Sequence, residues 1–324
     1  MGDIEVVVRE TRQLTPAIRE LVLETANGDA LPAWEPGAHI DVDVQLAGGA
    51  VENRAYSIIG GTADADDPAS AYRIAVERQP EGRGGSRFLH DEVSQGSALR
   101  ISPPRNEFPL HLHQADRLLV AGGIGIAPLY AMVRVLAKRK VPFALHYGGP
   151  GRDDMAYVEA LEHLAGRHVQ FHYDGGRMEL DPVLAALGYP AELYVCGQRP
   201  MNQAVVAAAM ENGLSRMQIL QQCFDPPPPP VANDQIGFEV VLKQSGKTVQ
   251  VPADTSILET LLTHGYPAQF YCGRGECGFC PLPVLEADGP IEHRDHYLSQ
   301  EERGEQMCIC VSRLKSGTRL VLDA

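Results

Sequence analysis

The sequence lacks the features that mark membrane-spanning, nucleic-acid-binding and secreted proteins. Its longest run without a charged side chain covers 16 residues (118–133) and includes three glycines and a proline, so it is too short for a membrane-spanning helix. Basic residues are few, since 28 Lys and Arg stand against 42 Asp and Glu and give a net charge of −14. This balance argues against general binding to nucleic acid or to anionic membranes. The first residues contain no basic and apolar leader segment, so a cytoplasmic location is expected.

The length and composition indicate a folded protein with more than one domain. The chain has 324 residues, of which 44% are hydrophobic and 22% are charged. These fractions exclude a disordered or fibrous chain. At about 100 to 200 residues per domain, two or three domains are expected.

Short alternating strands dominate the first hundred residues. The pattern predicts strands at residues 5–9, 19–24, 39–46, 54–59, 72–78 and 98–102, with one short helix at residues 86–92. Glycines and prolines separate these segments closely. This spacing is typical of an antiparallel β-barrel.

Strands and helices alternate from residue 117 onward. The predicted strands are residues 118–121, 143–147, 169–173, 193–196 and 218–222, and the predicted helices are residues 128–138, 155–165, 180–187 and 200–212. Such alternation predicts a parallel sheet with helices on both faces.

Five consecutive prolines, Pro226 to Pro230, predict a stiff extended spacer because proline continues neither a helix nor a sheet ladder. After this spacer the pattern predicts a hairpin, a helix, a cysteine-rich loop and two closing strands; these are residues 238–243 with 248–251, residues 256–264, and strands near Ile309 and Leu320. The expected domains are therefore a barrel domain (1–110), an α/β domain (111–225), a linker (226–235) and a last domain (236–324).

Five of the seven cysteines lie within 39 residues, and their spacing indicates a metal centre. Cys272, Cys277 and Cys280 have the C-x4-C-x2-C spacing of plant-type 2Fe-2S ferredoxins. Either Cys308 or Cys310 could be the fourth ligand. A structural zinc site is the alternative, although zinc sites favour paired C-x2-C arms.

This region resembles plant-type ferredoxins. Their usual gap of 29 residues before the last cysteine selects Cys310 as the fourth ligand and makes Cys308 a buried bystander. The resemblance implies a β-grasp domain of the α+β class that carries a one-electron cluster. Three glycines between the ligands would let the backbone wrap closely around an anionic cluster. These are Gly273, Gly275 and Gly278.

Two motifs in the barrel domain together indicate a flavin site. The first is Arg54-Ala55-Tyr56-Ser57, which alone could be an exposed arginine beside a half-buried strand tyrosine. The second is the turn Gly82-Arg83-Gly84-Gly85-Ser86, which precedes a short helix and could hold a phosphate with its backbone amides.

Together these motifs resemble those of the ferredoxin-NADP reductase superfamily, and specifically its phthalate dioxygenase reductase branch. The resemblance implies that Arg54 contacts the flavin phosphate, that Tyr56 packs against the isoalloxazine ring, and that Ser57 hydrogen-bonds the reactive edge. The turn resembles the phosphate loop of FMN-binding members, so FMN is expected rather than FAD. The expected flavin-binding residues are Arg54, Ala55, Tyr56, Ser57, Gly82, Gly84, Gly85 and Ser86.

Residues 119–128 (LVAGGIGIAP) predict a strand, a glycine turn and the start of a helix. Glycines let the backbone approach a pyrophosphate, and the helix dipole favours its charge. The turn resembles the family's G-G-x-G-x-[TA]-P motif, and Cys196-Gly197 resembles its strand-end C-G motif, whose cysteine lies near the nicotinamide. The family usually has proline where this chain has Gln198. The implied nucleotide-binding residues are Gly122, Gly123, Gly125, Pro128, Cys196 and Gly197.

Three further residues are expected near the cofactors. Arg152 lies where the family places an arginine on the ribose or phosphate side of the nucleotide, although Gly151 replaces the usual Ser or Thr. Asp174 ends a predicted strand, where its carboxylate would repel a 2′-phosphate and favour NADH over NADPH, with Arg177 as an opposing charge. Phe224 matches an aromatic residue that covers the flavin in relatives, or is an ordinary edge-strand residue.

The three modules form a chemically coherent series. NADH gives up two electrons as a hydride, a 2Fe-2S cluster accepts one, and a flavin converts between them. Ser57 beside the flavin and Cys196 beside the nicotinamide are the expected catalytic residues. By resemblance, the chain is expected to be an NADH-dependent flavin iron–sulfur oxidoreductase that serves a Rieske-type oxygenase of aromatic compounds.

Two other interpretations remain open. The chain could be an FAD-dependent NAD(P)H reductase of another monooxygenase, or a non-enzymatic redox-sensing protein. The eleven histidines show no ligand pattern. His111-x-His113 and His293-x-x-His296 are expected to be surface or loop histidines.

Overall fold

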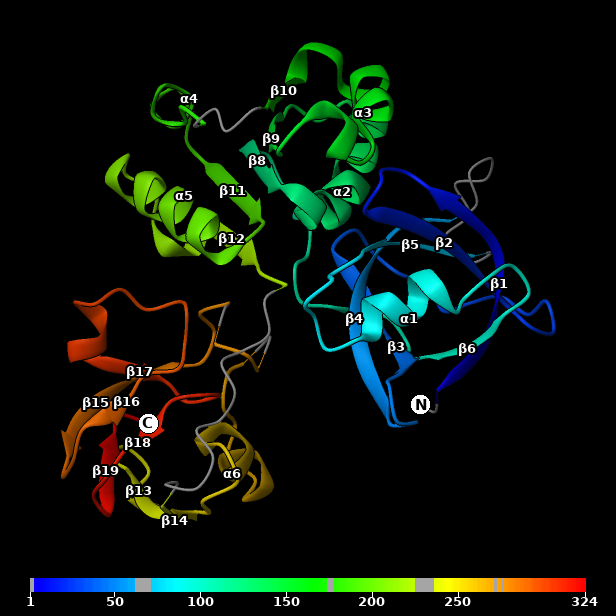
Figure 1. The fold of residues 1–324 in the computed structure, drawn as a ribbon. Helices are drawn as coiled ribbons and strands as arrows, with labels where there is room; N and C mark the ends of the chain where they lie inside the picture. The colour runs from blue at the N-terminus through cyan, green and yellow to red at the C-terminus, as the bar shows by residue number, and fades with distance from the viewer. Residues whose placement is uncertain (1–2, 62–70, 174–177, 225–235, 271–272, 276) are drawn as a thin grey trace. The chain divides into compact units, whose positions relative to one another are not determined.

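The computed structural model describes residues 3–61, 71–173, 178–224, 236–270, 273–275 and 277–324. It consists of two compact units, Met1–Phe224 and Asp225–Ala324 (Figure 1). The first unit contains a barrel and a parallel sheet, and the second contains a smaller mixed sheet.

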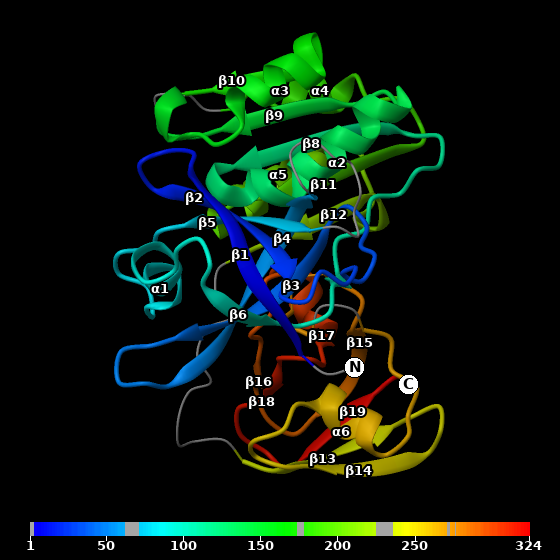
Figure 2. The same ribbon diagram turned by 90° about the vertical axis from the view of Figure 1, so that its right-hand side faces the viewer.

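The barrel is a closed ring of six antiparallel strands (Figure 2). They are β1 (Ile4–Gln13), β2 (Ile18–Thr25), β3 (Ala38–Gln45), β4 (Val51–Gly60), β5 (Tyr72–Glu77) and β6 (Ala98–Ile101). The order is β4-β5-β2-β1-β6-β3, and pairing of β3 with β4 closes the ring. The short strand β7 (Arg105–Asn106) also pairs with β3, and α1 (Gly85–Asp91) lies between β5 and β6 in the chain.

Alternation of side chains along the strands builds the barrel core. In β3, Ile40, Val42 and Val44 are fully buried, whereas Asp41 and Asp43 between them remain partly exposed. A strand with period-two burial can face a core on one side and solvent on the other. The expected antiparallel barrel is confirmed.

The second part of the first unit is a five-stranded parallel sheet in the order β10-β9-β8-β11-β12. Its strands are β8 (Asp116–Gly122), β9 (Ala144–Gly148), β10 (Val169–His172), β11 (Ala191–Cys196) and β12 (Ile219–Gln222). The helices are α2 (Ile126–Arg139), α3 (Val158–Ala165), α4 (Asp181–Ala185) and α5 (Arg199–Glu211). Short 3-10 turns cover Gly123–Gly125, Arg152–Asp154, Gly166–His168 and Arg216–Gln218.

Both faces of this sheet are covered, as expected for a parallel sheet. Leu119 and Ala121 of β8 join the core beneath α2 and α3, and Leu118 and Val120 join the core beneath α4 and α5. Figure 1 shows these two helix pairs on opposite sides of the sheet. The near-continuous apolar run of β8 is therefore explained by burial on both faces.

The second unit is a five-stranded mixed sheet packed on one helix. Its strands are β13 (Phe238–Leu242), β14 (Lys247–Val251), β15 (Pro281–Ala287), β17 (Gln306–Cys308) and β19 (Arg319–Leu322), in the order β14-β13-β19-β15-β17. The remaining elements are α6 (Ile257–Thr263), a 3-10 turn (Glu302–Gly304), and the paired short strands β16 (Ile291–Glu292) and β18 (Arg313–Leu314). Ser256 caps α6, since its hydroxyl oxygen accepts the Glu259 N–H at 3.0 Å.

The three-module architecture predicted from the sequence is confirmed, including the ferredoxin-type α+β module at the C-terminal end. The predicted strand near Ile309 ends one residue earlier, at Cys308, and β15 was not predicted. Within the part of the chain that the structure describes, no helix combines the length and the apolar character that crossing a bilayer demands.

Candidate functional site

The R-x-Y-S motif lies in β4, and the glycine-rich turn lies against it. A Cβ atom at Gly85 would stand 2.9 Å from Arg54 Cγ and 3.0 Å from Val44 Cγ2, so only glycine allows this approach. Gly84 precedes the first residue of α1. Its φ of 101° is a left-handed backbone conformation, which favours glycine. The structure therefore brings together the two motifs that the sequence separates by about thirty residues.

The polar groups beside this turn are arranged for a charged ligand. The Arg54 guanidinium is 2.7 Å from a Glu52 carboxylate oxygen and donates to the Asn53 carbonyl at 2.8 Å. Ser86 is used within the turn, since its hydroxyl oxygen accepts the Gln79 N–H at 3.0 Å. Arg54 packs directly against Gly85 of the turn, so its guanidinium can balance a phosphate there.

Two neighbouring side chains of β4, the buried Ser57 and the half-buried Tyr56, can contact a ligand in the barrel domain. Ser57 is 3% exposed, and its hydroxyl has no hydrogen-bond partner among the described residues. Burial raises the pKa of Tyr56 well above its ordinary value, although the charge of Arg54 opposes this shift, so the phenol stays neutral. A buried hydroxyl without a partner costs free energy unless a ligand satisfies it. This observation fits a bound flavin at Ser57.

The two nucleotide motifs meet at the carboxyl ends of adjacent parallel strands. A Cβ atom at Gly125 would overlap the carbonyl of Cys196, and a Cβ atom at Gly122 would lie 3.7 Å from the Cα atom of Gly197. These strands, β8 and β11, flank the point where the sheet order reverses direction, because β9 lies on one side of β8 and β11 on the other. In open α/β sheets, nucleotides bind in the crevice at such a point.

The turn itself has the conformation that the motif predicts. Gly123 has φ 54°, and a Cβ atom there would meet no other atom within 4 Å, so the backbone faces open space. Pro128 occupies the first turn of α2 and is buried. Cys196 is fully buried in the core shared by β8, β11 and α2, which makes it a packing residue in this conformation.

In this structure the Arg152 side chain is hydrogen-bonded to Glu162 and Tyr173. It lies in the 3-10 turn after β9 and donates to both carboxylate oxygens of Glu162 at 2.8 Å and to the Tyr173 hydroxyl at 3.3 Å. The carboxylate of Glu162 raises the pKa of Arg152, and Arg152 lowers the pKa of Glu162. The pair is exposed, so a bound phosphate can compete with Glu162 for the guanidinium.

The remaining expected cofactor residues lie at the edges of the described structure. Asp174 lies outside the described residues. Phe224 follows β12, and its ring is 41% exposed. It is therefore available to a ligand rather than packed in the core.

The cysteine loop has the conformation that the glycines predict. Gly273, Gly275 and Gly278 have φ values of 64°, 74° and 75°. A Cβ atom at Gly275 would lie 2.8 Å from Asp295 Cα, and one at Gly278 would overlap the ring of Tyr297. Two of these glycines are thus required by close packing as well as by the left-handed backbone.

The thiols of this loop converge. Cys280 Sγ lies 3.1 Å from Cys310 Sγ, and both side chains are buried. Hydrogen bonds from the thiols of Cys308 and Cys310 lower the pKa of Cys280 far below its ordinary value, which favours the thiolate that metals bind. Cys272 lies outside the described residues. The thiols of the described cysteines are the ligand type that an iron–sulfur cluster binds.

The sequence analysis did not predict the group formed by His111, His113 and Glu192. His111 and His113 are exposed loop histidines, as expected, but both point to the carboxylate of Glu192, which lies 81 and 79 positions further along the chain. Only the H-x-H spacing signals this group in the sequence. Its partner could not be found without the fold.

Comparisons with known proteins cover the chain from end to end. The description "Oxidoreductase NAD-binding domain" matches residues 119–175, and "2Fe-2S iron-sulfur cluster binding domain" matches residues 240–315. The reductase subunit of a toluene-4-sulfonate monooxygenase system from Comamonas testosteroni is 36% identical over 99% of each chain. The beta subunit of a heme-dependent oxidative N-demethylase from Ectopseudomonas mendocina is 36% identical over 99% of this chain and 98% of its own.

A solved structure is similar over the same length. Phthalate dioxygenase reductase, described as a modular structure for electron transfer from pyridine nucleotides to [2Fe-2S], is 30% identical. The match has a TM-score of 0.64 and covers 100% of this chain and 98% of the other. All three modules thus recur together in the same relative.

Proposed function

Because this chain belongs to the phthalate dioxygenase reductase branch of the ferredoxin-NADP reductase superfamily, we propose that it serves a Rieske-type oxygenase that acts on an aromatic compound. The chain is an NADH-dependent oxidoreductase that passes electrons through FMN and a 2Fe-2S cluster to an oxygenase. The oxygenase class and its substrate are the proposed part.

The observation that carries this function is the end-to-end similarity to reductases that combine the same modules in one chain. A two-electron donor and a one-electron cluster need a converter between them, and a flavin has that capacity. The buried hydroxyl of Ser57, for which the described part of the chain offers no hydrogen-bond partner, supports a flavin in the barrel independently of the similarity.

Residues of β4 and of the glycine-rich turn hold FMN in this proposal. Arg54 and the backbone amides of Gly84, Gly85 and Ser86 balance and bind its phosphate. Tyr56 packs against the ring, and Ser57 donates a hydrogen bond to the ring edge. Ala55 and Gly82 complete these two segments. When bound, FMN supplies the acceptor for a hydride and the donor of single electrons.

Residues at the carboxyl ends of β8 and β11 hold NADH. The glycine turn lets the backbone approach the pyrophosphate, and the start of α2 favours its negative charge. With the cofactors bound, Cys196 and Gly197 would lie near the nicotinamide, and Phe224 would cover the flavin. The Arg152 guanidinium would release Glu162 and bind the ribose or phosphate side of the nucleotide. The carboxylate of Asp174 would repel the 2′-phosphate of NADPH and so favour NADH. The turn residues are Gly122, Gly123, Gly125 and Pro128.

The cluster is bound by Cys272, Cys277, Cys280 and Cys310 in this proposal. The low pKa of Cys280 supports its role as a thiolate ligand. We also place the domain limits at 1–110, 111–225, 226–235 and 236–324, with the proline-rich segment as linker. A cytoplasmic setting is consistent with cysteines that bind metal rather than form disulfides.

The partner class is the open part of the proposal. A toluene-4-sulfonate monooxygenase and a phthalate dioxygenase act on aromatic compounds by name, which supports an aromatic substrate. A heme-dependent oxidative N-demethylase also has a subunit similar to this chain, so a heme partner is the second candidate.

Electron delivery to purified oxygenases distinguishes these partners. The holoprotein is reduced by NADH without oxygen and mixed with Rieske-type oxygenases of aromatic acids and, separately, with heme-dependent demethylases. We expect the visible absorption of the Rieske centre to be bleached much faster than the heme absorption changes. Reaction with the heme proteins alone would contradict the Rieske assignment, and each mixture without NADH is its control.

A further inference from the structure

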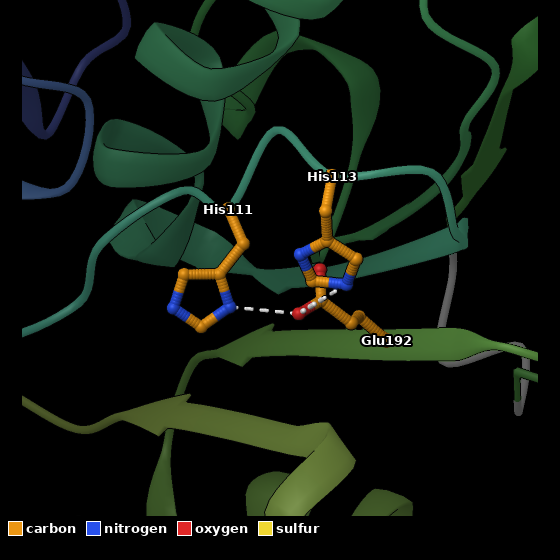
Figure 3. A group of neighbouring side chains, drawn as sticks. All are labelled: His111, His113 and Glu192. Atoms are coloured by element: carbon orange, nitrogen blue, oxygen red, sulfur yellow. Dashed lines mark hydrogen bonds and ion pairs between the residues drawn. The ribbon is translucent and has the colours of Figure 1, made fainter.

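His111, His113 and Glu192 form a compact group at the start of the parallel sheet. The two histidines lie in the segment that connects the barrel to β8, and Glu192 is the second residue of β11. One carboxylate oxygen of Glu192 is 2.7 Å from His111 Nδ1 and 3.5 Å from His113 Nε2 (Figure 3). All three ligand atoms lie within 4.8 Å of one another.

The group is held in place by a surrounding hydrogen-bond network. The Tyr194 hydroxyl donates to the other oxygen of Glu192 at 3.1 Å and accepts the backbone N–H of His111 at 3.0 Å. The fully buried guanidinium of Arg117 donates to the carbonyls of His111, His113 and Ala115. The loop that carries both imidazoles is therefore fixed against β11, as a preformed site requires.

Exposure of the three residues differs in a way that suits a ligand. The Glu192 side chain is 8% exposed, whereas the His111 and His113 side chains are 45% and 55% exposed. The negative oxygen forms the floor, and the two imidazoles form an open rim. An incoming ion can reach all three ligand atoms without opening the fold.

We propose that His111, His113 and Glu192 form a binding site for a divalent transition-metal ion of the zinc class. Two imidazole nitrogens and one carboxylate oxygen are ligands that zinc binds in proteins. At zinc-to-ligand distances of about 2.0–2.2 Å, the ligand atoms of a tetrahedral site are roughly 3.3 Å apart, a value between the two observed oxygen-to-nitrogen separations of 2.7 and 3.5 Å. The exposed rim leaves the fourth position to water.

This site lies at the opposite edge of the parallel sheet from the nucleotide motifs. Asp116 and Ala191 begin β8 and β11 at the edge where the group lies, and Gly122 and Cys196 end the same strands at the nucleotide edge. A bound ion would add metal–ligand bonds between the barrel-to-sheet connection and β11, beside the hydrogen bonds that Glu192 and Tyr194 of β11 already make to His111. It therefore acts as a cross-link within the first unit and takes no electron.

The positive charge of Arg117 limits the affinity. Its Nε lies 3.7 Å from the carboxylate oxygen that faces away from the histidines. The guanidinium and the metal ion thus share one carboxylate. Binding is therefore expected to be reversible.

Calorimetric titration of the full-length holoprotein with Zn²⁺ tests the site. The wild type, His113→Ala and His163→Ala are compared at pH 7.5 in buffer without chelators. The His113 side chain lies 3.5 Å from the Glu192 carboxylate and contacts the ring of His111, and His163 is an exposed histidine of α3 with no part in the group. We expect one Zn²⁺ per wild-type chain, a Kd raised at least about tenfold by His113→Ala, and no comparable change for His163→Ala.

Visible absorption spectra and a Glu192→Gln variant serve as controls for the Zn²⁺ titration. The visible absorption and its bleaching by NADH confirm that each variant holds its flavin and cluster, which also excludes zinc bound by vacated cysteines. Glu192→Gln should weaken Zn²⁺ binding as His113→Ala does. If His113→Ala binds Zn²⁺ as tightly as the wild type, or if the wild type binds none, the proposed site is wrong.

Discussion

Three cysteine thiols of the second unit lie close together, and two of them, Cys308 and Cys310, are candidates for the fourth cluster ligand. Cys280 is flanked by Cys308 and Cys310, and the thiols of both residues lower its pKa. The side chain of Cys308 is fully buried in the core beneath α6, and its own pKa is raised by Cys280 and by burial. Cys310 is buried in the same core, and its Sγ lies 3.1 Å from Cys280 Sγ. The spacing of plant-type ferredoxins selects Cys310 over Cys308, and we keep Cys310 as the proposed fourth ligand.

Matched serine variants test this choice. Cys310→Ser should remove most of the broad visible absorption of the cluster, because serine provides no soft thiolate. Cys308→Ser should retain that absorption, since it changes only a buried side chain. The measurement is the visible spectrum of each purified holoprotein, with the flavin band as an internal standard. Loss of the cluster in Cys308→Ser with retention in Cys310→Ser would reverse the assignment.

At the scale of elements, one buried polar cluster joins the barrel to the helices of the parallel sheet. Glu20 of β2 accepts hydrogen bonds from Arg73 of β5 at 2.6 Å and from the hydroxyl of Tyr157 at 2.8 Å. Tyr157 precedes α3 and stacks on Tyr130 of α2, with ring centroids 4.4 Å apart. A buried carboxylate with two donors is satisfied, so this contact fixes how the two sheets of the first unit pack.

Removing a single hydroxyl from this cluster should loosen the first unit. Tyr157→Phe keeps the ring stack but leaves Glu20 with one donor fewer, at a cost of about 1 kcal/mol. The expected result is release of the flavin at a temperature about 2–4 °C lower, measured by flavin fluorescence during heating. Tyr189→Phe is the control, because the Tyr189 side chain is 93% exposed. Equal shifts in both variants would count against the role of the cluster.

Most elements could be predicted from periodicity, and the failures have physical causes. The strand β15 begins with Pro281-Leu282-Pro283, and proline normally argues against a strand. It forms here because β15 pairs with β17 and β19 over different parts of its length. The turns at the ends of β8 and β11 were predictable because glycine is required where backbones nearly touch.

Contacts between distant residues could not be predicted. The pairing of His111 and His113 with Glu192 joins residues about 80 positions apart, and the pairing of Arg152 with Glu162 depends on how α3 lies beside the turn after β9. The family resemblance assigns Arg152 to a nucleotide, and the sequence leaves the histidines as surface or loop residues. Roles that depend on local backbone conformation were accessible, and roles that depend on long-range contacts were not.

At the scale of the whole molecule, the central claim is that one chain holds a nucleotide site, a flavin and a one-electron cluster. Along the chain the nucleotide module (119–175) stands between the barrel and the cluster module (240–315), whereas electrons pass from the nucleotide through the flavin to the cluster, so the order of the modules differs from the order of electron transfer. Two electrons reduce the flavin and one reduces the cluster, so each chain stores three. A protein with zinc in place of iron would store only two.

Anaerobic titration of the purified holoprotein with NADH measures this capacity directly. With NADH in the anaerobic cell, the flavin band and the broad iron–sulfur absorption should both bleach, and the change should end at about 1.5 NADH per chain. Bleaching of the flavin alone at about one NADH per chain would exclude a reducible cluster. A pigment that stays oxidised in excess NADH would contradict the account as a whole.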